Sequence, residues 1–325
     1  MADKPDGEHD AGPVSSFRDR LASGEFAVTA EIGPPRGADT APVAAKARLL
    51  RGWVDAVNIT DNQSAAVRLS SLAGSMAALA AGVEPIMQLT CRDRNRIALQ
   101  SELLSASALG IPSVVIMTGD HPRHGDHAEA KPVFDLDSTQ LLRVATAMRD
   151  HGRLMSGGEL RPAPRWLLGA VENPPAASAA AEAAETASFR LAAKIEAGAQ
   201  FVQTQFVFDV AAFAAWMRRL SDLGLLARCS VLAGVGPVRS QRALAHLSSI
   251  PGVVIPDAVA GRLTAASSPE QFRAEGERLC AEIIAGLADV PGVAGVHVMA
   301  IGAEGRIPAI LEQAGLPARA AGLTA

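Results

Sequence analysis

The feature that most constrains the fold is a regular alternation of short apolar runs with longer helical ones. Eight short runs, most of them β-rich, each end in polar or glycine residues: Phe26–Ile32, Ala56–Thr60, Pro85–Thr90, Ser113–Thr118, Trp166–Val171, Phe201–Phe206, Ser230–Gly234 and Gly295–Ile301. Stretches with helical periodicity separate them: Ala41–Arg51, Arg94–Ala108, Thr139–His151, Ala179–Ala197, Ala211–Leu223 and Gln241–Ser248. Strands that alternate with helices predict parallel βαβ units.

The spacing of the units indicates which parallel architecture they build. The first four strands begin near residues 26, 56, 85 and 113. The interval from one start to the next is the length of one βα unit. Eight such units favour an α/β fold of the (β/α)8 TIM-barrel type over a doubly wound open sheet. The glycine pattern GxGxxG does not follow the first strand, which weakens the open-sheet alternative. We predict a single barrel domain over residues 16–325, with extra helices within residues 255–290.

Composition excludes several classes of protein. The net charge of -4 argues against a general nucleic-acid or membrane-surface binder. No apolar run reaches the about 20 residues of a membrane span, and residues 1–15 are polar, as in a disordered leader. Three cysteines without a CxxC pair suggest a reducing compartment. We therefore expect a cytoplasmic protein with no membrane or nucleic-acid partner.

In such a barrel the carboxyl ends of the strands form the active site, which we call the mouth. The residues at these ends are mainly amides, hydroxyls and carboxylates: Glu31, Thr60, Gln63, Gln88, Thr90, Thr118, Asp120, Glu172, Asn173, Gln203 and Gln205. Lysine, arginine, histidine and cysteine are scarce there. The set suits hydrogen bonding to an amide-rich heterocycle and offers no nucleophile–base pair of the hydrolase type. The histidines of the 121–127 loop predict a flexible polar loop rather than a metal site.

Each of the candidate residues can be interpreted in two ways, as part of the structure or as part of a functional site. A carboxylate on a buried strand, such as Glu31, costs several kcal/mol unless it is paired or used. Asp120 follows Gly119 and either binds a ligand or caps its own loop. Gln203 and Gln205 share one strand face, where they bind a ligand or bond to neighbours inside the barrel. Lys194 lies in a predicted helix, and the residues around it alone favour a solvent-exposed lysine on that helix.

Five motifs in this order resemble the methylenetetrahydrofolate reductase family. The resemblance runs from about Phe26 to Gly315, and its landmarks are Glu31–Pro35, Leu89–Cys91, Gly119–Pro122, Lys194–Ala199 and Thr204–Asp209. It is closest to a branch with Thr-Gly-Asp at 118–120 and the segment Lys131–Ser138.

The resemblance implies a (β/α)8 barrel that carries a flavin, FAD in many members. Hydride passes from NADH or NADPH to the flavin, and then to 5,10-methylenetetrahydrofolate to give 5-methyltetrahydrofolate. By motif, Glu31 matches the catalytic glutamate that helps to open the methylene bridge. Asp120 matches an aspartate near flavin and pterin, Gln205 matches a folate-binding glutamine, and Thr60 and Lys194 match flavin contacts. Gln203 joins Gln205 as a substrate-binding candidate.

The chain departs from the family pattern around the flavin. Thr118 stands where many members have an arginine, and Gln88 where a histidine often stands. The end of the fifth strand, with Glu172 and Asn173, lacks the tyrosine and histidine that many FAD-binding members use there, and the chain contains no tyrosine. We assign these four positions to the cofactor, while FMN or no flavin stays an alternative to FAD.

Two other functions stay open alongside the reductase. One is a folate-binding barrel of one-carbon metabolism that works in the oxidative, demethylating direction. The other is a non-catalytic folate- or flavin-binding subunit of a complex. A homo-oligomer or a partner subunit is compatible with each.

Overall fold

Eight parallel strands close into a barrel in which each strand pairs with its neighbours in sequence and β8 pairs with β1. The computed structural model describes residues 16–175, 181–250 and 252–319, so the leader expected at residues 1–15 lies outside the described residues. The strands are β1 Ala27–Ile32, β2 Ala56–Ile59, β3 Pro85–Thr90, β4 Ser113–Met117, β5 Leu167–Glu172, β6 Phe201–Phe206, β7 Ser230–Val235 and β8 Val293–Val298. The barrel prediction is confirmed, with strand ends shifted by a few residues at most.

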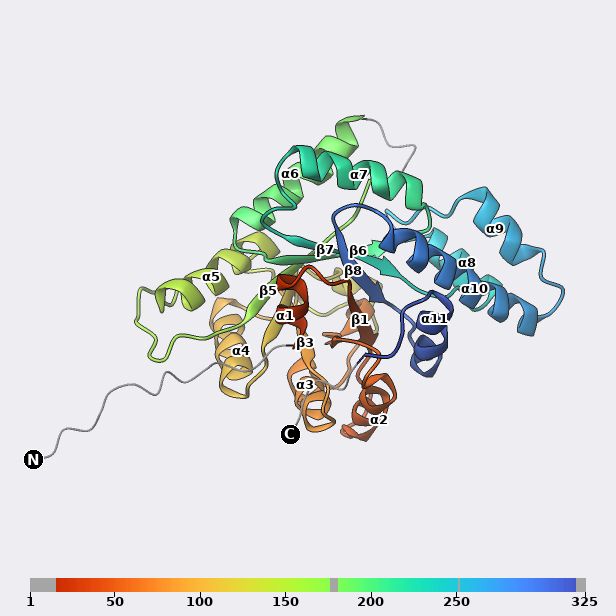
Figure 1. Ribbon diagram of the computed structural model, residues 1–325. Coiled ribbons are helices and arrows are strands. Elements are labelled where there is room, and N and C mark those ends of the chain that lie inside the picture. Colours follow the sequence, from red (N-terminus) through yellow and green to blue (C-terminus); the bar gives the residue numbers. More distant parts are fainter. Residues whose placement is uncertain (1–15, 176–180, 251, 320–325) are drawn as a thin grey trace, which may run out of the picture.

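Helices surround the strands, as Figure 1 shows. The α-helices are α1 Ser16–Ala22, α2 Ala41–Leu50, α3 Ser71–Ala80, α4 Arg96–Ala108, α5 Ser138–His151, α6 Ala181–Glu196, α7 Val210–Asp222, α8 Gln241–Ser248, α9 Asp257–Thr264, α10 Pro269–Ala288 and α11 Ile307–Gln313. Three short 3₁₀ turns are η1 Gln63–Ala65, η2 Pro122–His124 and η3 Glu304–Arg306. The extra helices expected within 255–290 are α9 and α10. No helix of the described chain is long and apolar enough to cross a membrane.

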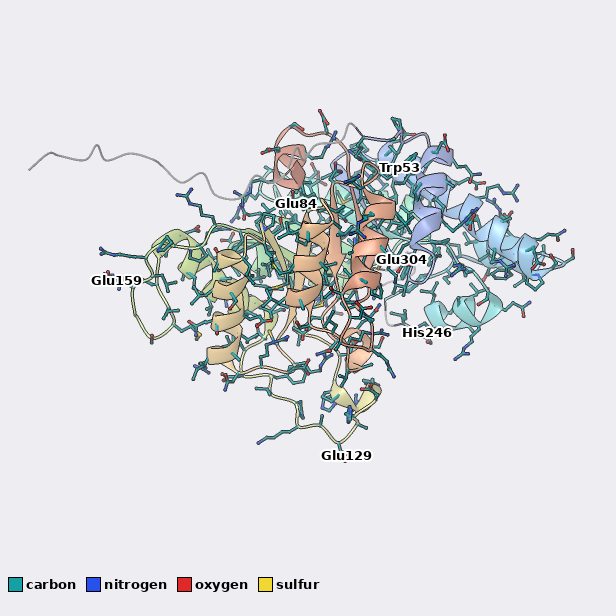
Figure 2. The ribbon with its side chains drawn as sticks, turned by 90° about the horizontal axis from the view of Figure 1, so that it is seen from below. Trp53, Glu84, Glu129, Glu159, His246 and Glu304 are labelled. Carbon is teal, nitrogen blue, oxygen red and sulfur yellow. The ribbon has the colours of Figure 1, made fainter. Side chains whose placement is uncertain are left out.

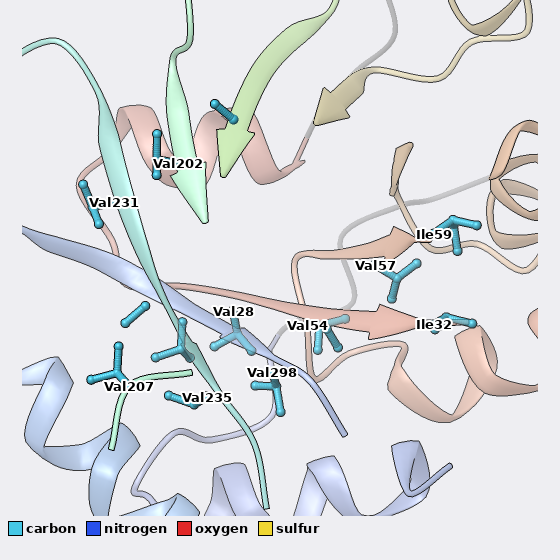
Figure 3. Close-up of a cluster of buried hydrophobic side chains, with 14 of the residues drawn as sticks. Val28, Ile32, Val54, Val57, Ile59, Val202, Val207, Val231, Val235 and Val298 are labelled. Carbon is cyan, nitrogen blue, oxygen red and sulfur yellow. The ribbon is translucent and has the colours of Figure 1, made fainter. Parts of the chain in front are cut away.

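Alternate side chains of each strand face opposite sides, and this alternation creates two cores. The outward-facing residues pack beneath the helices, and Figure 3 shows Val28, Val57, Val202 and Val298 among them. The inward-facing residues form a second apolar cluster at the amino ends of the strands. We call this end of the barrel the base.

The base is plugged by α1. Phe17 is fully buried and meets Phe201 of β6 edge to face, with ring centroids 5.1 Å apart. Gly169 of β5 makes room for the Phe201 ring, because a Cβ at this position would lie 2.3 Å from Phe201 Cζ. The backbone N–H of Phe17 donates to Glu84 Oε2 at 3.2 Å. The plug closes this end of the barrel.

The carboxyl-terminal segment also reaches the base. Arg319 Nη1 lies 3.2 Å from Asp55 Oδ1, and Arg20 Nε of α1 donates to the same oxygen at 3.2 Å. Asp55 Oδ2 accepts the backbone N–H of Val28 at 2.7 Å. Burial raises the pKa of Asp55, although both guanidinium groups oppose the rise. Segments from both ends of the described chain therefore meet at one carboxyl group.

A polar layer lies above the apolar base, inside the barrel. It consists of Thr29, Asn58, Gln203 and His297, each at most 3% exposed. Three of them follow a base residue of their own strand by two positions: Thr29 follows Ala27, Asn58 follows Ala56 and Gln203 follows Phe201. The layer supports the mouth residues that come next along the strands.

Candidate active site at the mouth of the barrel

Glu31 lies at the centre of the mouth, two residues after Thr29 on the inner face of β1. Its side chain is 7% exposed. Gln63 Nε2 donates to Oε1 at 3.2 Å, Gln88 Nε2 donates to Oε2 at 3.4 Å, and His297 Nε2 lies 3.7 Å from Oε2. Among the described residues, no lysine or arginine lies within ion-pair distance of Glu31. The carboxyl group is thus surrounded by groups that both donate and accept hydrogen bonds.

Gln63 is carried by a backbone segment in an unfavourable conformation. Asn62, Ser64 and Ala65 have φ angles of 46°, 57° and 54°, in the left-handed region. For residues with a Cβ this costs roughly 1–2 kcal/mol each. Neighbouring contacts therefore have to hold the segment that brings the Gln63 amide to Glu31.

Part of that support comes from the long loop after β4. Gly125 packs so closely that a Cβ there would lie 1.8 Å from the carbonyl oxygen of Ala65. Asp126 accepts the backbone N–H of Val67 on both oxygens at 3.2 Å and pairs with Arg36 at 3.3 Å. Figure 2 places Glu129 of this loop at the end of the molecule opposite Glu84 and the plug. The loops after β1, β2 and β4 are thus joined above the mouth.

Two arginines of the loop after β3, which the sequence reasoning did not single out, hold neighbouring loops of the mouth. Arg94 donates to both oxygens of Asp61, at 2.7 and 3.1 Å, and Asp61 also accepts the backbone and hydroxyl of Thr90. Arg92 is 3% exposed; it pairs with Asp93 and donates to the carbonyls of Asn62 and Asp120. In the sequence, the signal for these two arginines was the run of charged residues directly after the end of β3. Both cations are neutralised by neighbouring carboxylates.

Asp120 and Thr118 lie on the exposed rim of the mouth. The Asp120 backbone is held by Arg92, and its side chain is exposed. Thr118 Oγ1 donates to Ser138 Oγ at 3.2 Å. The Asp120 side chain thus lies at the surface, while its backbone is fixed from the loop after β3.

The two glutamines of β6 differ in their surroundings. Gln203 exchanges two hydrogen bonds with Asn58, at 2.6 and 3.0 Å, and donates to Thr29 at 3.2 Å. Its amide is thus used within the polar layer below Glu31. Gln205 is half-buried, and its Oε1 accepts the backbone N–H of Phe206 at 3.3 Å. No described residue accepts a hydrogen bond from the Gln205 amide nitrogen.

The residues assigned to a flavin do not form one cluster. Thr60 faces inward, is 1% exposed, and its hydroxyl has no hydrogen-bond partner. Glu172 is at an outward-facing position of β5. Its Oε1 accepts a hydrogen bond from Arg190 of α6 at 2.8 Å, and its Oε2 pairs with Lys194 at 2.8 Å. Lys194 also donates to the Val171 carbonyl at 2.6 Å. Gln88 belongs to the surroundings of Glu31, and Asn173 follows Glu172 at the rim.

The cysteines add no thiolate chemistry to the mouth. Burial raises the pKa of the Cys91 thiol, like those of Cys229 and Cys280, to about 12, so all three are uncharged at neutral pH. The described residues contain no group of three metal-ligating side chains. Acid–base and binding chemistry centred on Glu31 is what the arrangement supports.

Comparisons with known proteins agree with this arrangement. The family model described as methylenetetrahydrofolate reductase matches residues 16–315. The chain is 25% identical over 252 residues to a probable methylenetetrahydrofolate reductase (NADPH) of Caenorhabditis elegans, covering 76% of this chain and 34% of that protein. It is 22% identical over 235 residues to methylenetetrahydrofolate reductase 1 of Schizosaccharomyces pombe, covering 72% and 36%. The chain therefore spans about a third of the length of these curated relatives.

Solved structures share the barrel fold. An uncharacterized protein from Clostridium thermocellum that binds two copies of 5-methyl-5,6,7,8-tetrahydrofolic acid superposes with a TM-score of 0.64 at 14% identity, covering 92% of this chain and 99% of that one. An EDTA monooxygenase from Chelativorans sp. BNC1 follows with a TM-score of 0.52 at 12% identity, covering 91% and 100%. At these identities the likeness concerns the fold alone. From the family match over nearly its whole length, the chain belongs to the methylenetetrahydrofolate reductase family.

Proposed function

We propose that this chain reduces 5,10-methylenetetrahydrofolate to 5-methyltetrahydrofolate, with Glu31 as the proton donor. The proton goes to N10 of the folate as the bond from N10 to the methylene carbon breaks. The resulting iminium at N5 accepts a hydride and becomes the N5-methyl group. Family membership and the names of the two curated relatives support this reaction.

The observation that carries the proposal is the surroundings of the Glu31 carboxyl group. A lysine or arginine in contact would hold the group ionised and unable to give up a proton. The amides of Gln63 and Gln88 hydrogen-bond to either form of the acid. The surroundings of Glu31 therefore fit both the acid and its carboxylate, as general acid catalysis requires.

We propose that the substrate lies between Glu31 and the rim, with Asp120 and Gln205 as contacts to the folate. Asp120 is exposed on the rim, and the Gln205 amide nitrogen is available for an acceptor on the pterin. A carboxylate near the ring stabilises positive charge that develops on the substrate.

The residues fit a flavin only in part. Thr60 presents a buried hydroxyl that lacks a partner, as expected beneath a bound ring. Lys194 and Glu172 neutralise each other between β5 and α6, away from the inner face of the barrel. We derive no step through a flavin. The proposal takes reduced nicotinamide as the electron source, and the identity of any chromophore released from denatured protein decides between FAD, FMN and no flavin.

The test of the proposal is Glu31→Gln. Glutamine keeps the shape of the side chain but cannot supply the proton. We expect methylenetetrahydrofolate-dependent oxidation of NADH or NADPH to fall at least about 100-fold, with little change in folate affinity. Steady-state rates and equilibrium binding of 5-methyltetrahydrofolate measure the two effects.

Glu304→Gln is the matched control. Glu304 is a carboxylate of similar burial, 4% exposed, but it pairs with Lys46 of α2 at 2.6 Å. Its variant is expected to keep the turnover of the folded enzyme. Full folate turnover by the Glu31→Gln variant would remove Glu31 from the mechanism.

A further inference from the structure

Arg239 is a cation at the mouth that has no carboxylate of the described residues within ion-pair distance. It belongs to the loop after β7, and its Nη1 donates to the carbonyl of Gly302, in the loop after β8, at 3.1 Å. Its Nε is buried and has no hydrogen-bond partner. Arg92 and Arg94, by contrast, each pair with an aspartate. A guanidinium group partly removed from water without a counter-ion is costly, and a bound anion offsets that cost.

The loops that carry Arg239 and Gly302 are joined through their backbones. A Cβ at Gly236 would lie 2.4 Å from the carbonyl oxygen of Met299. The backbone N–H of Met299 donates to the carbonyl of Val235 at 2.7 Å. These contacts hold the two loops together without the Arg239 side chain. The bond to Gly302 therefore orients the guanidinium group, which keeps further N–H groups for another partner.

The helix α8 begins directly after Arg239. Ser240 caps this helix, and its hydroxyl accepts the backbone N–H of Ala243 at 3.1 Å. The N–H groups in the first turn of a helix carry a partial positive charge and are frequent contacts of bound anions. The unpaired guanidinium group and the start of α8 are thus two sources of positive potential that adjoin each other at the mouth.

Arg68 is another arginine whose Nε is buried without a partner. It lies in the loop after β2, which β8 and β1 separate from β7. Its Nη1 donates to the carbonyl of Pro34 at 3.2 Å, and its backbone N–H donates to Asn62 Oδ1 at 3.1 Å. Asn62 precedes Gln63, which contacts Glu31. Arg68 therefore supports the surroundings of Glu31, and it provides a comparison for Arg239.

We propose that Arg239 and the first turn of α8 bind the anionic end of a ligand whose ring lies over Glu31. The inference rests on the proposed function, which supplies two such ligands. The folate carries carboxylates on its glutamate tail, away from the pterin, and the nicotinamide dinucleotide carries phosphates. A guanidinium group binds either oxyanion through charge-assisted hydrogen bonds. We expect the folate tail, because Gln205, the proposed pterin contact, lies on β6, next to β7.

The test measures equilibrium binding of ligands with and without the anionic end. 5-Methyltetrahydrofolate is compared with 5-methyltetrahydropteroate, which lacks the glutamate, and NADH and NADPH are compared with reduced nicotinamide riboside, which lacks the phosphates. We expect the wild-type protein to bind the folate about tenfold more tightly than the pteroate. Arg239→Gln should bind the two with equal affinity. A preference lost only between the dinucleotides and the riboside would assign the same site to the phosphates.

Arg68→Gln is the matched control, and it should keep the wild-type ratio of folate to pteroate affinity. Arg239→Lys retains the charge and should keep part of the preference. Nitrogen-15 NMR of the arginine-labelled wild-type protein gives a second readout. The Nε–H signal that is absent from both Arg239 variants should shift with the folate and not with the pteroate.

Three results would each overturn the inference: wild-type ratios for both kinds of ligand in Arg239→Gln, equal weakening of all the ligands, or an Nε–H signal of Arg239 that no anionic ligand shifts. Retained turnover in Glu31→Gln would instead overturn the proposed function. The binding ratios do not depend on turnover, so the two failures can be told apart.

Discussion

At the scale of single residues, Lys194 and Glu172 show why a motif match and a side-chain environment carry different information. Lys194 matches a flavin-contacting position and Glu172 was also assigned to the cofactor, yet the two form an ion pair between β5 and α6. Glu172 is 4% exposed, and its carboxylate is paired with Lys194 and with the more exposed Arg190. An unpaired carboxylate at such a site is costly.

We expect Lys194→Met to lower the free energy of unfolding by about 2 kcal/mol. The double variant Lys194→Met/Glu172→Gln should recover part of this loss, because it leaves no unpaired buried charge. Urea denaturation measures the stabilities, and the amount of chromophore bound per folded molecule is followed in parallel. Unchanged stability together with lost chromophore would assign Lys194 to the cofactor instead.

The position of Glu31 could be predicted from the sequence because a few consecutive residues indicate a strand, the side chains that face inward and the residue at which the strand ends. The contacts of Glu31 could not be predicted in this way. Gln63, Gln88 and His297 come from three other strands or their loops, and only the closure of the barrel brings them together. The bonds of Gln203 to Asn58 and Thr29 depend in the same way on distances across the barrel.

At the scale of elements, the decisive contact is the one between the loops after β2 and β4. Gly125 allows the second loop to lie against the strained backbone that carries Gln63. We expect Gly125→Ala to separate the loops and to lower kcat about tenfold, with a small change in the midpoint of unfolding. Activity measurements and hydrogen exchange of residues 62–67 test this.

Gly37→Ala is the control for the same kind of change. Gly37 follows β1, near the mouth, and a Cβ there meets nothing within 4 Å. This variant should retain normal exchange and turnover. If Gly125→Ala behaves like Gly37→Ala, the contact between the loops does not support Gln63.

The helices show where periodicity is a sufficient signal and where it is not. Gln241–Ser248 was predicted to the residue, and α5 to within one residue, because polar and apolar positions alternate clearly. The prediction missed α3, since Ser71–Ala80 consists of small and apolar residues without a charged face. It also missed α1 and α11, which are seven residues long and owe their helical state to packing against the barrel.

At the scale of the whole molecule, the barrel divides stability and chemistry between its two ends. The apolar base, with Phe17 at its centre, contributes stability, while the mouth holds a buried carboxyl group and strained backbone. We expect Phe17→Ala to lower the free energy of unfolding by about 3–5 kcal/mol. The turnover of the molecules that remain folded should change little.

Phe189→Ala provides the comparison for chemical denaturation of this variant. The Phe189 side chain on α6 is 66% exposed, and its removal should cost less than about 0.5 kcal/mol. Equal losses from the two substitutions would show that α1 does not stabilise the barrel.

The meeting of Arg20 and Arg319 at Asp55 has a practical consequence. The segments that carry Arg20 and Arg319 both lie at the base of the barrel. The side chains proposed to bind folate lie at the opposite end. An affinity tag or a surface linker attached near either segment would orient the barrel with its opening toward solution. Ligand binding could then be followed on an immobilised protein without the support obstructing the entrance.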